Sequence, residues 1–249
     1  MIRYYRTVSM NQTVTHAIRA LPVALKPQAA PGTWECALMQ LPATGSILNA
    51  GAGRGGISLL LDRSGLTVTS LDLHPDHFVA EGLTCEFADL TQPLAFVDDT
   101  YDAVIAVEVA EHLENPWLFL REAIRVLRPG GVLVFTSPNV VNLVCRFNFL
   151  VTGVLPYFRE ESFTGCYHVT PIFPWSVERW CGTTTAQLEF VSYSRVDWPT
   201  RKDIPKFYAG GFVRGLKDML PLNSWTGEIT CYTIRKIGTV RTNVGLHYA

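Results

Sequence analysis

A glycine-rich turn between two apolar segments is the feature of this chain whose residue types most clearly suggest chemistry. Gly51, Gly53, Gly55 and Gly56 lie within ILNAGAGRGGISLLL, residues 47–61. Glycine allows unusual φ angles and a close approach of the backbone to a ligand. The helix that follows presents free N–H groups and the positive end of its dipole to the turn. We therefore expect a nucleotide-type cofactor there, the alternative being a tight strand-to-helix turn without a ligand.

Two aspartates follow at the ends of the next two predicted strands. Asp72 comes about 20 residues after the turn, where a carboxylate can accept hydrogen bonds from both hydroxyls of a ribose. The alternative is a turn aspartate before His74 and Pro75. Asp89 could accept the amino group of an adenine, or it could cap the next turn.

Alternating strand and helix patterns position these residues. The parallel strands are predicted at 46–50, from Gly65 to Asp72, and at 83–90, 101–107 and 132–138, with helices at 32–41, after the turn to Arg63 and from Pro116 to Arg128. Leu118, Leu120, Ile124 and Leu127 should face the core. Such a succession requires a mostly parallel sheet with helices on both faces, and its ligand lies outside the carboxyl ends of the strands.

Composition limits the class of protein. The chain has 249 residues, 48% of them hydrophobic, and a net charge of −1, which is no electrostatic footprint for nucleic acid. Its six cysteines are scattered without a CxxC pair, which favours buried, unpaired thiols in a reducing compartment. The sequence shows neither a signal peptide nor a stretch long enough to span a membrane. We expect one cytoplasmic domain, residues 1–249, with an N-terminal extension at 1–30.

These motifs together resemble the class I S-adenosylmethionine-dependent methyltransferases. The family motif acid-x-Gly-x-Gly-x-Gly is matched from Asn49, and YDAVIAVEVAEHLENPWLFLREAIRVLRPGGVLVFTSPN is similar to the region from strand four to strand five of ubiquinone-type methyltransferases. The resemblance implies an α/β, Rossmann-like, doubly wound, seven-stranded, mostly parallel sheet. It implies that S-adenosyl-L-methionine contacts Asn49, Gly51, Gly53, Gly55, Asp72, Leu73, Asp89, Leu90 and Glu108. Asn49 stands where the family usually has an acid, and we expect binding to persist because an amide also accepts hydrogen bonds.

The reaction that the resemblance implies is in-line transfer of the sulfonium methyl to a nucleophile of the substrate. A hydroxyl acceptor would need a base, and His112 and His168 are the two candidate catalytic residues. The alternative for His112 is a packing or capping role. Glu108, Glu111 and His112 also resemble the divalent-cation site of ubiquinone O-methyltransferases and small-RNA 2′-O-methyltransferases, with His168 as a further ligand. The sequence leaves a metal undecided.

Residues 138–186 form the predicted substrate lid after strand five. The apolar stretch 146–158 could close over an acceptor pocket, rest on a membrane surface as a peripheral contact, or pack on a sheet edge. The string at 165–175 resembles the lid of methyltransferases that modify bacterial glycans and glycolipids, which favours a sugar or lipid-linked acceptor. Strand six is predicted at 188–198 and an antiparallel strand seven at 227–237. The basic loop between them, 199–225, could meet an anionic acceptor or be a solvated face.

The predicted function is methyl transfer to a small-molecule, sugar or lipid-linked acceptor, most readily at oxygen. Two alternatives remain open at this stage. An NAD-dependent oxidoreductase is disfavoured by the segment EVAEHLENP and by the absence of a Tyr-x-x-x-Lys string. A cofactor-binding protein without catalysis remains conceivable because Asn49 replaces an acid.

Overall fold

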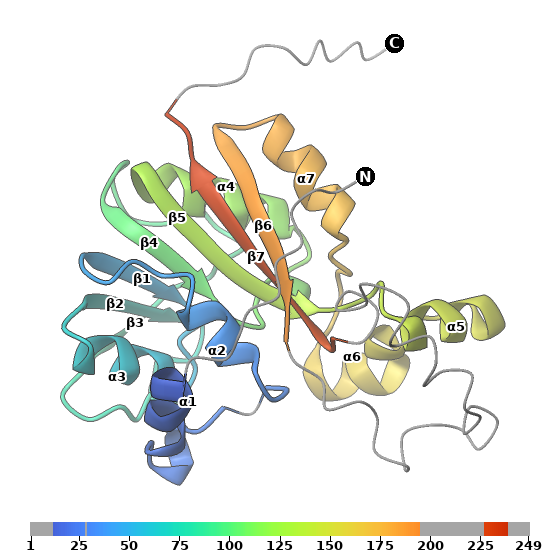
Figure 1. Ribbon diagram of the computed structural model, residues 1–249, viewed down its shortest axis with the longest axis horizontal. Coiled ribbons are helices and arrows are strands. Elements are labelled where there is room, and N and C mark those ends of the chain that lie inside the picture. Colours follow the sequence, from blue (N-terminus) through green and yellow to red (C-terminus); the bar gives the residue numbers. More distant parts are fainter. Residues whose placement is uncertain (1–11, 28, 195–226, 239–249) are drawn as a thin grey trace.

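Five strands form the parallel part of one seven-stranded sheet (Figure 1). The computed structural model describes residues 12–27, 29–194 and 227–238. The parallel strands are β1 (Ser46–Ala50), β2 (Thr67–Asp72), β3 (Cys85–Phe87), β4 (Tyr101–Ala106) and β5 (Leu127–Pro138). The strand order is β3-β2-β1-β4-β5-β7-β6. The order therefore reverses between β1 and β4, and open sheets of this kind bind ligands at such a point.

Two antiparallel strands complete the sheet. Strand β7 (Ile229–Lys236) lies between β5 and β6 (Ala186–Tyr193) and runs antiparallel to both. The prediction of an antiparallel pair at the end of the chain is thus confirmed. The predicted strand six extended to residue 198, but 195–226, with the whole basic loop, falls outside the described residues.

Alternate residues of the central strands pack against helices on opposite faces, as the pleat of a strand requires. On one face, Leu48 and Val104 pack with helices α4 (Pro116–Val126) and α7 (Pro174–Gly182). On the other, Ile47 and Ile105 pack with α2 (Thr33–Leu38) and α3 (Gly56–Arg63). The doubly wound α/β fold predicted from the sequence is therefore confirmed.

The N-terminal residues that the structure describes cover α3. Helix α1 (Gln12–Arg19) and the 3-10 turn η1 (Val23–Leu25) contribute Ile18 and Leu25 to a small core with Leu60. The backbone oxygen of Ala24 also accepts a 2.8 Å hydrogen bond from Arg54 Nε, in the glycine turn. The extension thus supports the element that begins at the turn, a role that the sequence did not indicate.

Helix α4 begins at a cap and ends earlier than predicted. Asn115 Oδ1 accepts a hydrogen bond from the backbone N–H of Leu118, and Pro116 takes the first helical position, as is common. The helix ends at Val126 and not at Arg128, because Leu127 already pairs with Tyr101 of β4. Leu118 is half-buried, so that prediction of a core residue is wrong, while Leu120, Ile124 and Leu127 are buried.

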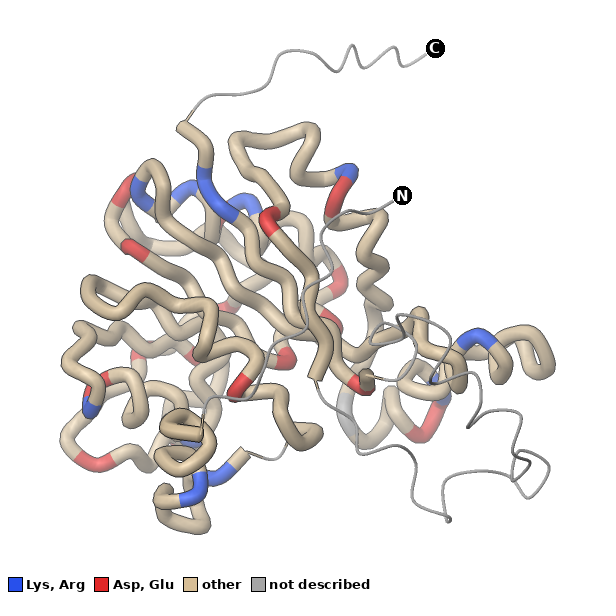
Figure 2. Tube along the Cα trace, in the orientation of Figure 1, with Lys and Arg blue, Asp and Glu red and all other residues tan. Residues whose placement is uncertain are grey.

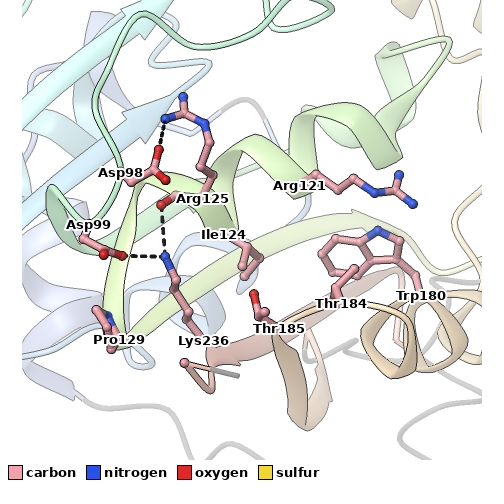
Figure 3. A pocket seen from close by; sticks show the side chains of 11 residues that line it. Asp98, Asp99, Arg121, Ile124, Arg125, Pro129, Trp180, Thr184, Thr185 and Lys236 are labelled. Atoms are coloured by element: carbon pink, nitrogen blue, oxygen red, sulfur yellow. Dashed lines mark hydrogen bonds and ion pairs between the residues drawn. The ribbon is translucent and has the colours of Figure 1, made fainter. Parts of the chain in front are cut away.

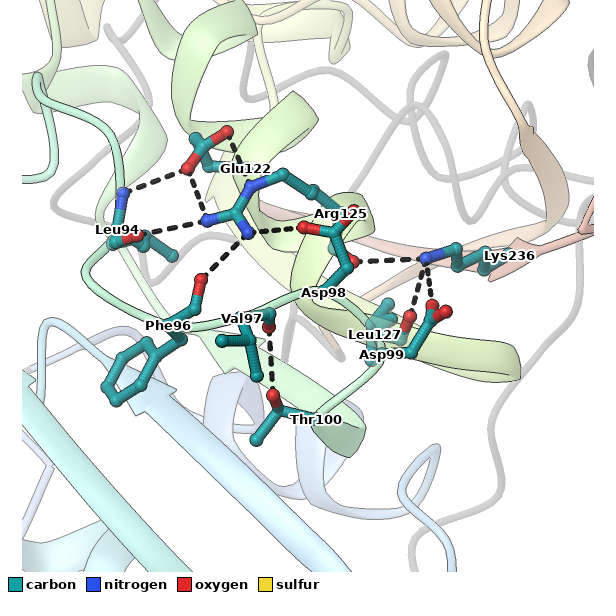
Figure 4. Close-up of polar contacts among 10 residues, drawn as sticks. All are labelled: Leu94, Phe96, Val97, Asp98, Asp99, Thr100, Glu122, Arg125, Leu127 and Lys236. Atoms are coloured by element: carbon teal, nitrogen blue, oxygen red, sulfur yellow. Dashed lines mark hydrogen bonds and ion pairs between the residues drawn. The ribbon is translucent and has the colours of Figure 1, made fainter.

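A polar network fixes the loop before β4 onto α4 and β7 (Figure 4). The Arg125 guanidinium donates hydrogen bonds to the carboxylates of Glu122 and Asp98 and to the backbone oxygens of Leu94 and Phe96. Lys236 Nζ extends the network, as it donates to Asp99 and to the backbone oxygens of Arg125 and Leu127. The network is structural and lies at the amino ends of the parallel strands.

The segment after β5 is helical. It comprises α5 (Leu143–Thr152), η4 (Pro156–Phe158) and α6 (Glu160–Cys166), followed by α7. Asn142 caps α5 by accepting a hydrogen bond from the backbone N–H of Cys145. None of the helices in the described ranges has the length and apolar content needed to cross a bilayer.

The cysteines largely follow the prediction. Cys36, Cys145, Cys181 and Cys231 are buried free thiols, whereas Cys85 is only half-buried. The remaining short turns are η2 (Pro75–His77) and η3 (Ala110–His112).

Candidate functional site

The glycine turn joins β1 to α3 at the carboxyl end of the strand. Gly51, Gly53 and Gly55 all have positive φ angles, of 75°, 53° and 91°, which other residues rarely adopt. A Cβ atom at position 51 would lie 2.4 Å from Cγ2 of Val109, so this position has no room for a side chain. The backbone N–H of Gly51 also donates a 2.9 Å hydrogen bond to Leu71 of β2. The turn is thus held rigidly between two neighbouring elements.

Asp72 lies directly at this turn. Its Oδ2 accepts a 2.7 Å hydrogen bond from the backbone N–H of Gly53, and its Oδ1 accepts one of 2.8 Å from His74. Each carboxylate oxygen has further acceptor capacity, so both can still receive a hydroxyl. The structure therefore places Asp72, the residue predicted to bind a ribose, against the backbone of the glycine turn.

Asn49 is buried beneath the turn. Its Nδ2 donates a 2.9 Å hydrogen bond to Ser58 of α3, and Ser58 is in turn bonded to Ser70 of β2. Its Oδ1 is buried, and no described part of the chain offers it a hydrogen bond. An orphaned buried acceptor costs on the order of 1–3 kcal/mol, so a ligand that offers an N–H donor near the turn would find a partner here. The residues of this turn fit a cofactor that carries an amino group and a ribose.

Asp89 is the cap of its own turn. Its Oδ1 accepts hydrogen bonds from the backbone N–H and the hydroxyl of Thr91, and these two bonds lower the pKa of the carboxyl. The structure thus shows the capping alternative for Asp89. Leu90 is buried, whereas Leu73 is half exposed beside Asp72.

Glu108 adopts a positive φ of 55° immediately after β4, a conformation that is uncommon for residues other than glycine. Thr136 of β5 holds it there, because the Thr136 hydroxyl accepts from the Glu108 backbone N–H and donates to Oε1. Burial raises the pKa of Glu108 to about 7, although the hydrogen bond from Thr136 opposes this shift. Thr136 escaped the sequence analysis, yet a hydroxyl near the end of an apolar strand could have indicated it.

Glu111 is fully buried, and neither carboxylate oxygen has a hydrogen-bond partner among the residues that the structure describes. Burial raises its pKa well above the ordinary value, and the nearby Glu108 raises it further. The backbone oxygen of Glu111 accepts hydrogen bonds from Val169 and Thr170. The segment that carries His168 is therefore fastened to η3.

His112 and His168 lie edge to face, with ring centroids 4.9 Å apart. His168 Nδ1 lies 2.9 Å from the backbone oxygen of Tyr157, which can only accept a hydrogen bond. Nδ1 therefore carries the proton, and Nε2 is the ring's acceptor in the neutral form. Ligand atoms of Glu111, His112 and His168 lie within 4.8 Å of one another, while Glu108 faces Thr136 instead. The structure thus joins the two candidate bases into one site.

A surface hollow of about 410 Å³ lies away from these residues (Figure 3). Trp180, Thr185 and Lys236 are among its lining residues, at the amino ends of the parallel strands. The glycine turn, in contrast, follows a carboxyl end. Because Lys236 is paired with Asp99 in the structural network, this hollow is not assigned to the cofactor.

The chain is similar to known methyltransferases. Residues 48–135 match the model of a family described as a methyltransferase domain. The chain is 31% identical over 130 residues to a demethylmenaquinone methyltransferase of Tropheryma whipplei, covering 50% of this chain and 51% of that protein. It is 29% identical over 164 residues to a ubiquinone biosynthesis O-methyltransferase of Xanthomonas axonopodis, covering 61% and 66%. The matched stretch thus spans about half the length of the first of these relatives.

A solved structure shares the fold. A SAM-dependent methyltransferase from Archaeoglobus fulgidus superposes with a TM-score of 0.55 at 15% identity, covering 80% of this chain and 89% of that one. The cofactor of this class is S-adenosylmethionine. Residues 48–135 of this chain thus match a methyltransferase domain, and its sheet has the fold of an S-adenosylmethionine-dependent methyltransferase.

Proposed function

We propose that this protein binds S-adenosylmethionine at the glycine turn and transfers a methyl group to an oxygen of a small-molecule, sugar or lipid-linked acceptor. The observation that carries the proposal is the bond between Asp72 and the backbone N–H of Gly53, which unites a ribose ligand with the cradle of a nucleotide cofactor. When bound, the cofactor supplies an electrophilic methyl group on a sulfonium. The protein's task is then to position the acceptor and exclude water.

Each candidate residue has a defined task in this proposal. Asp72 binds the ribose hydroxyls, and Asp89 with the buried Leu90 holds the adenine end. The methionine end lies near Asn49 and Glu108. The remaining contacts of the proposed cofactor site come from the turn and from the residue after Asp72: Gly51, Gly53, Gly55 and Leu73.

His168 is the proposed base. With its Nδ1 proton directed to Tyr157, its Nε2 can accept the proton of an acceptor hydroxyl as the oxygen is methylated. His112 lies against its ring and orients or shares the proton. A second role for the same cluster is to hold a divalent cation through Glu111, His112 and His168, since hard carboxylates and imidazoles suit magnesium or manganese.

A transfer assay separates these roles. With a base mechanism, His168→Ala lowers kcat steeply, and EDTA leaves the wild type unchanged. With a cation, EDTA abolishes activity and added magnesium or manganese restores it. Glu111→Gln would then raise the metal concentration needed for half-maximal activity.

The names of the relatives guide the choice of acceptor. Demethylmenaquinone and ubiquinone precursors are apolar molecules, and residues 143–158 supply an apolar segment beside His168. A quinone-like or glycolipid acceptor would require peripheral contact with a membrane. A screen should therefore include quinols and lipid-linked sugars presented in detergent.

Calorimetric titration tests the proposal first. The wild type is titrated with S-adenosylmethionine, S-adenosylhomocysteine and NAD, beside Asp72→Ala and the exposed control Asp76→Ala. We expect binding of both sulfur compounds and none of NAD, with at least a tenfold loss in Asp72→Ala alone, since bonds to a charged group contribute about 1.5–3 kcal/mol. Binding of NAD alone would establish an oxidoreductase. Binding without transfer across the acceptor screen would favour the non-catalytic alternative.

A further inference from the structure

Helix α5 presents apolar side chains to solvent. Only Cys145 of its ten residues is buried, whereas Leu150 is 80% and Val151 64% exposed. Val144, Phe147 and Val151 follow the i, i+3, i+7 spacing of a single helix face, and all three are exposed. An amphipathic helix of a soluble domain normally turns such a face toward the core. Here the face lies on the outside, on a helix that projects beyond the sheet (Figure 1).

The charges from Asn142 to Arg159 are basic, whereas α6 begins with Glu160 and Glu161. Residues 142–159 contain Arg146 and Arg159 but no aspartate or glutamate, and Figure 2 shows a basic segment and no acidic one along α5. The side chains of both arginines donate hydrogen bonds to uncharged oxygens, on Val141 and Asn148. An apolar face with basic neighbours is complementary to acyl chains beneath anionic headgroups.

The face is continuous with the acceptor side of the proposed site. Helix α5 leads into η4, where the backbone oxygen of Tyr157 accepts the hydrogen bond from His168, and the Phe158 ring lies 5.7 Å from the His168 ring. A molecule held in a bilayer under α5 would therefore have its polar head close to His168.

We propose that α5 docks this protein on a lipid bilayer, with Val144, Leu150 and Val151 among the acyl chains and Arg146 and Arg159 at the headgroups. The convex surface of α5 fits the continuous apolar interior of a bilayer, and Arg146 of α5 together with Arg159 before α6 fits anionic headgroups. The docking itself does not depend on the assignment of His168 as the base. The corollary, that the acceptor is embedded in the membrane, rests on the proposed function.

Vesicle cosedimentation of the full chain tests the docking. Vesicles of phosphatidylcholine alone and with phosphatidylglycerol are used, because Glu160 and Glu161 follow on α6 and could oppose an anionic surface. The variants are Leu150→Glu, Val151→Glu and the control Val97→Glu, which places the same charge on a side chain that is 77% exposed before β4. Calorimetry with S-adenosylhomocysteine is run on each variant.

We expect the wild type to bind vesicles, more tightly when phosphatidylglycerol is present. Each α5 variant should lose at least about tenfold in partition, because burial of one large apolar side chain carries that much affinity. Val97→Glu should bind vesicles like the wild type, and S-adenosylhomocysteine binding should be unchanged in all three variants.

Four results would overturn the docking. The wild type could fail to bind either kind of vesicle, or all three variants could bind equally well. A dimer of the wild type that Leu150→Glu makes monomeric, without vesicle binding, would identify a second copy as the occupant. A lower melting temperature of Leu150→Glu without vesicle binding by the wild type would identify another segment of the chain as the occupant of the apolar face of α5. In contrast, vesicle binding without S-adenosylhomocysteine binding would retain the docking and refute the proposed function.

Discussion

At the scale of single residues, Gly51 is the position where the cofactor turn has least freedom. Gly51→Ala would make the new Cβ overlap the Val109 side chain, and it would also force alanine into a φ of 75°. Steric overlap and backbone strain would therefore both destabilise the variant. We expect a loss of about 3 kcal/mol in the free energy of unfolding, together with weaker S-adenosylhomocysteine binding. Gly65→Ala is the matched control, since its φ of 83° is similar but its Cβ would meet open space. Equal losses in urea titrations of the two variants would refute the close approach.

Glu108 gives a pH dependence whose sign is fixed by its environment. Burial raises its pKa from 4.5 to about 7, so the folded state holds the proton over a range in which the unfolded state releases it. Stability from this group is therefore present below about pH 4.5 and is lost as the pH rises toward 7. Glu108→Gln keeps an acceptor for Thr136 and removes the titration.

Urea unfolding in EDTA at pH 5 and pH 8 measures the effect. Between these pH values the wild type should lose on the order of 2–3 kcal/mol more than Glu108→Gln. The exposed Glu161→Gln serves as a control for the loss of one carboxylate. If the stability of Glu108→Gln and of the wild type depended on pH in the same way, the raised pKa of Glu108 would be contradicted.

Local residue patterns carried the prediction of the cofactor turn, and the structure brings Asp72 to Gly53 as expected. Other parts of the site depend on contacts between distant segments. The approach of His168 to His112 requires the helices after β5 to fold back onto η3, and no local pattern reports that. The bond between Glu108 and Thr136 likewise depends on the register of β4 against β5.

At the scale of elements, α4 depends on Arg125 to hold the loop before β4. Arg125→Lys keeps the charge but cannot reach Glu122, Asp98, Leu94 and Phe96 at once. We expect it to lower the free energy of unfolding by about 2 kcal/mol. Arg121→Lys on the exposed side of the same helix is the control and should change it by less than about 0.5 kcal/mol. Chemical denaturation measures both, and indistinguishable variants would show that the network adds no stability.

The elements themselves were largely predictable, because buried parallel strands are short apolar runs and α4 carries its own cap. β1 matches its predicted range, whereas the predicted third strand at 83–90 shrinks to Cys85–Phe87 at the sheet edge. The early start of β5 at Leu127 could not be seen, since pairing with Tyr101 replaces a helical turn there. The sequence left open whether the apolar stretch 146–158 covers a pocket, rests on a membrane or packs on a sheet edge, and only the fold shows that α5 turns apolar side chains outward.

At the scale of the whole molecule, one sheet unites every strand that the structure describes, so unfolding should be a single cooperative transition. S-adenosylhomocysteine at 100 times its dissociation constant should add about 2.7 kcal/mol and raise the melting temperature by roughly 5–10 °C. NAD at the same concentration serves as the control and should leave it unchanged. Scanning calorimetry that resolved two transitions, only one of them shifted, would show that the sheet is not one unit.

The position of β7 also has a consequence for biosynthesis. Strand β5 is bonded on its outer side by residues 229–236, which leave the ribosome after all the other strands. Until then the nascent chain exposes an unpaired edge of β5, and β6 has no neighbour within the sheet, a state that invites pairing with other chains. Interrupted translation or proteolysis upstream of Ile229 should therefore yield clients for chaperones and proteases and not a smaller folded protein.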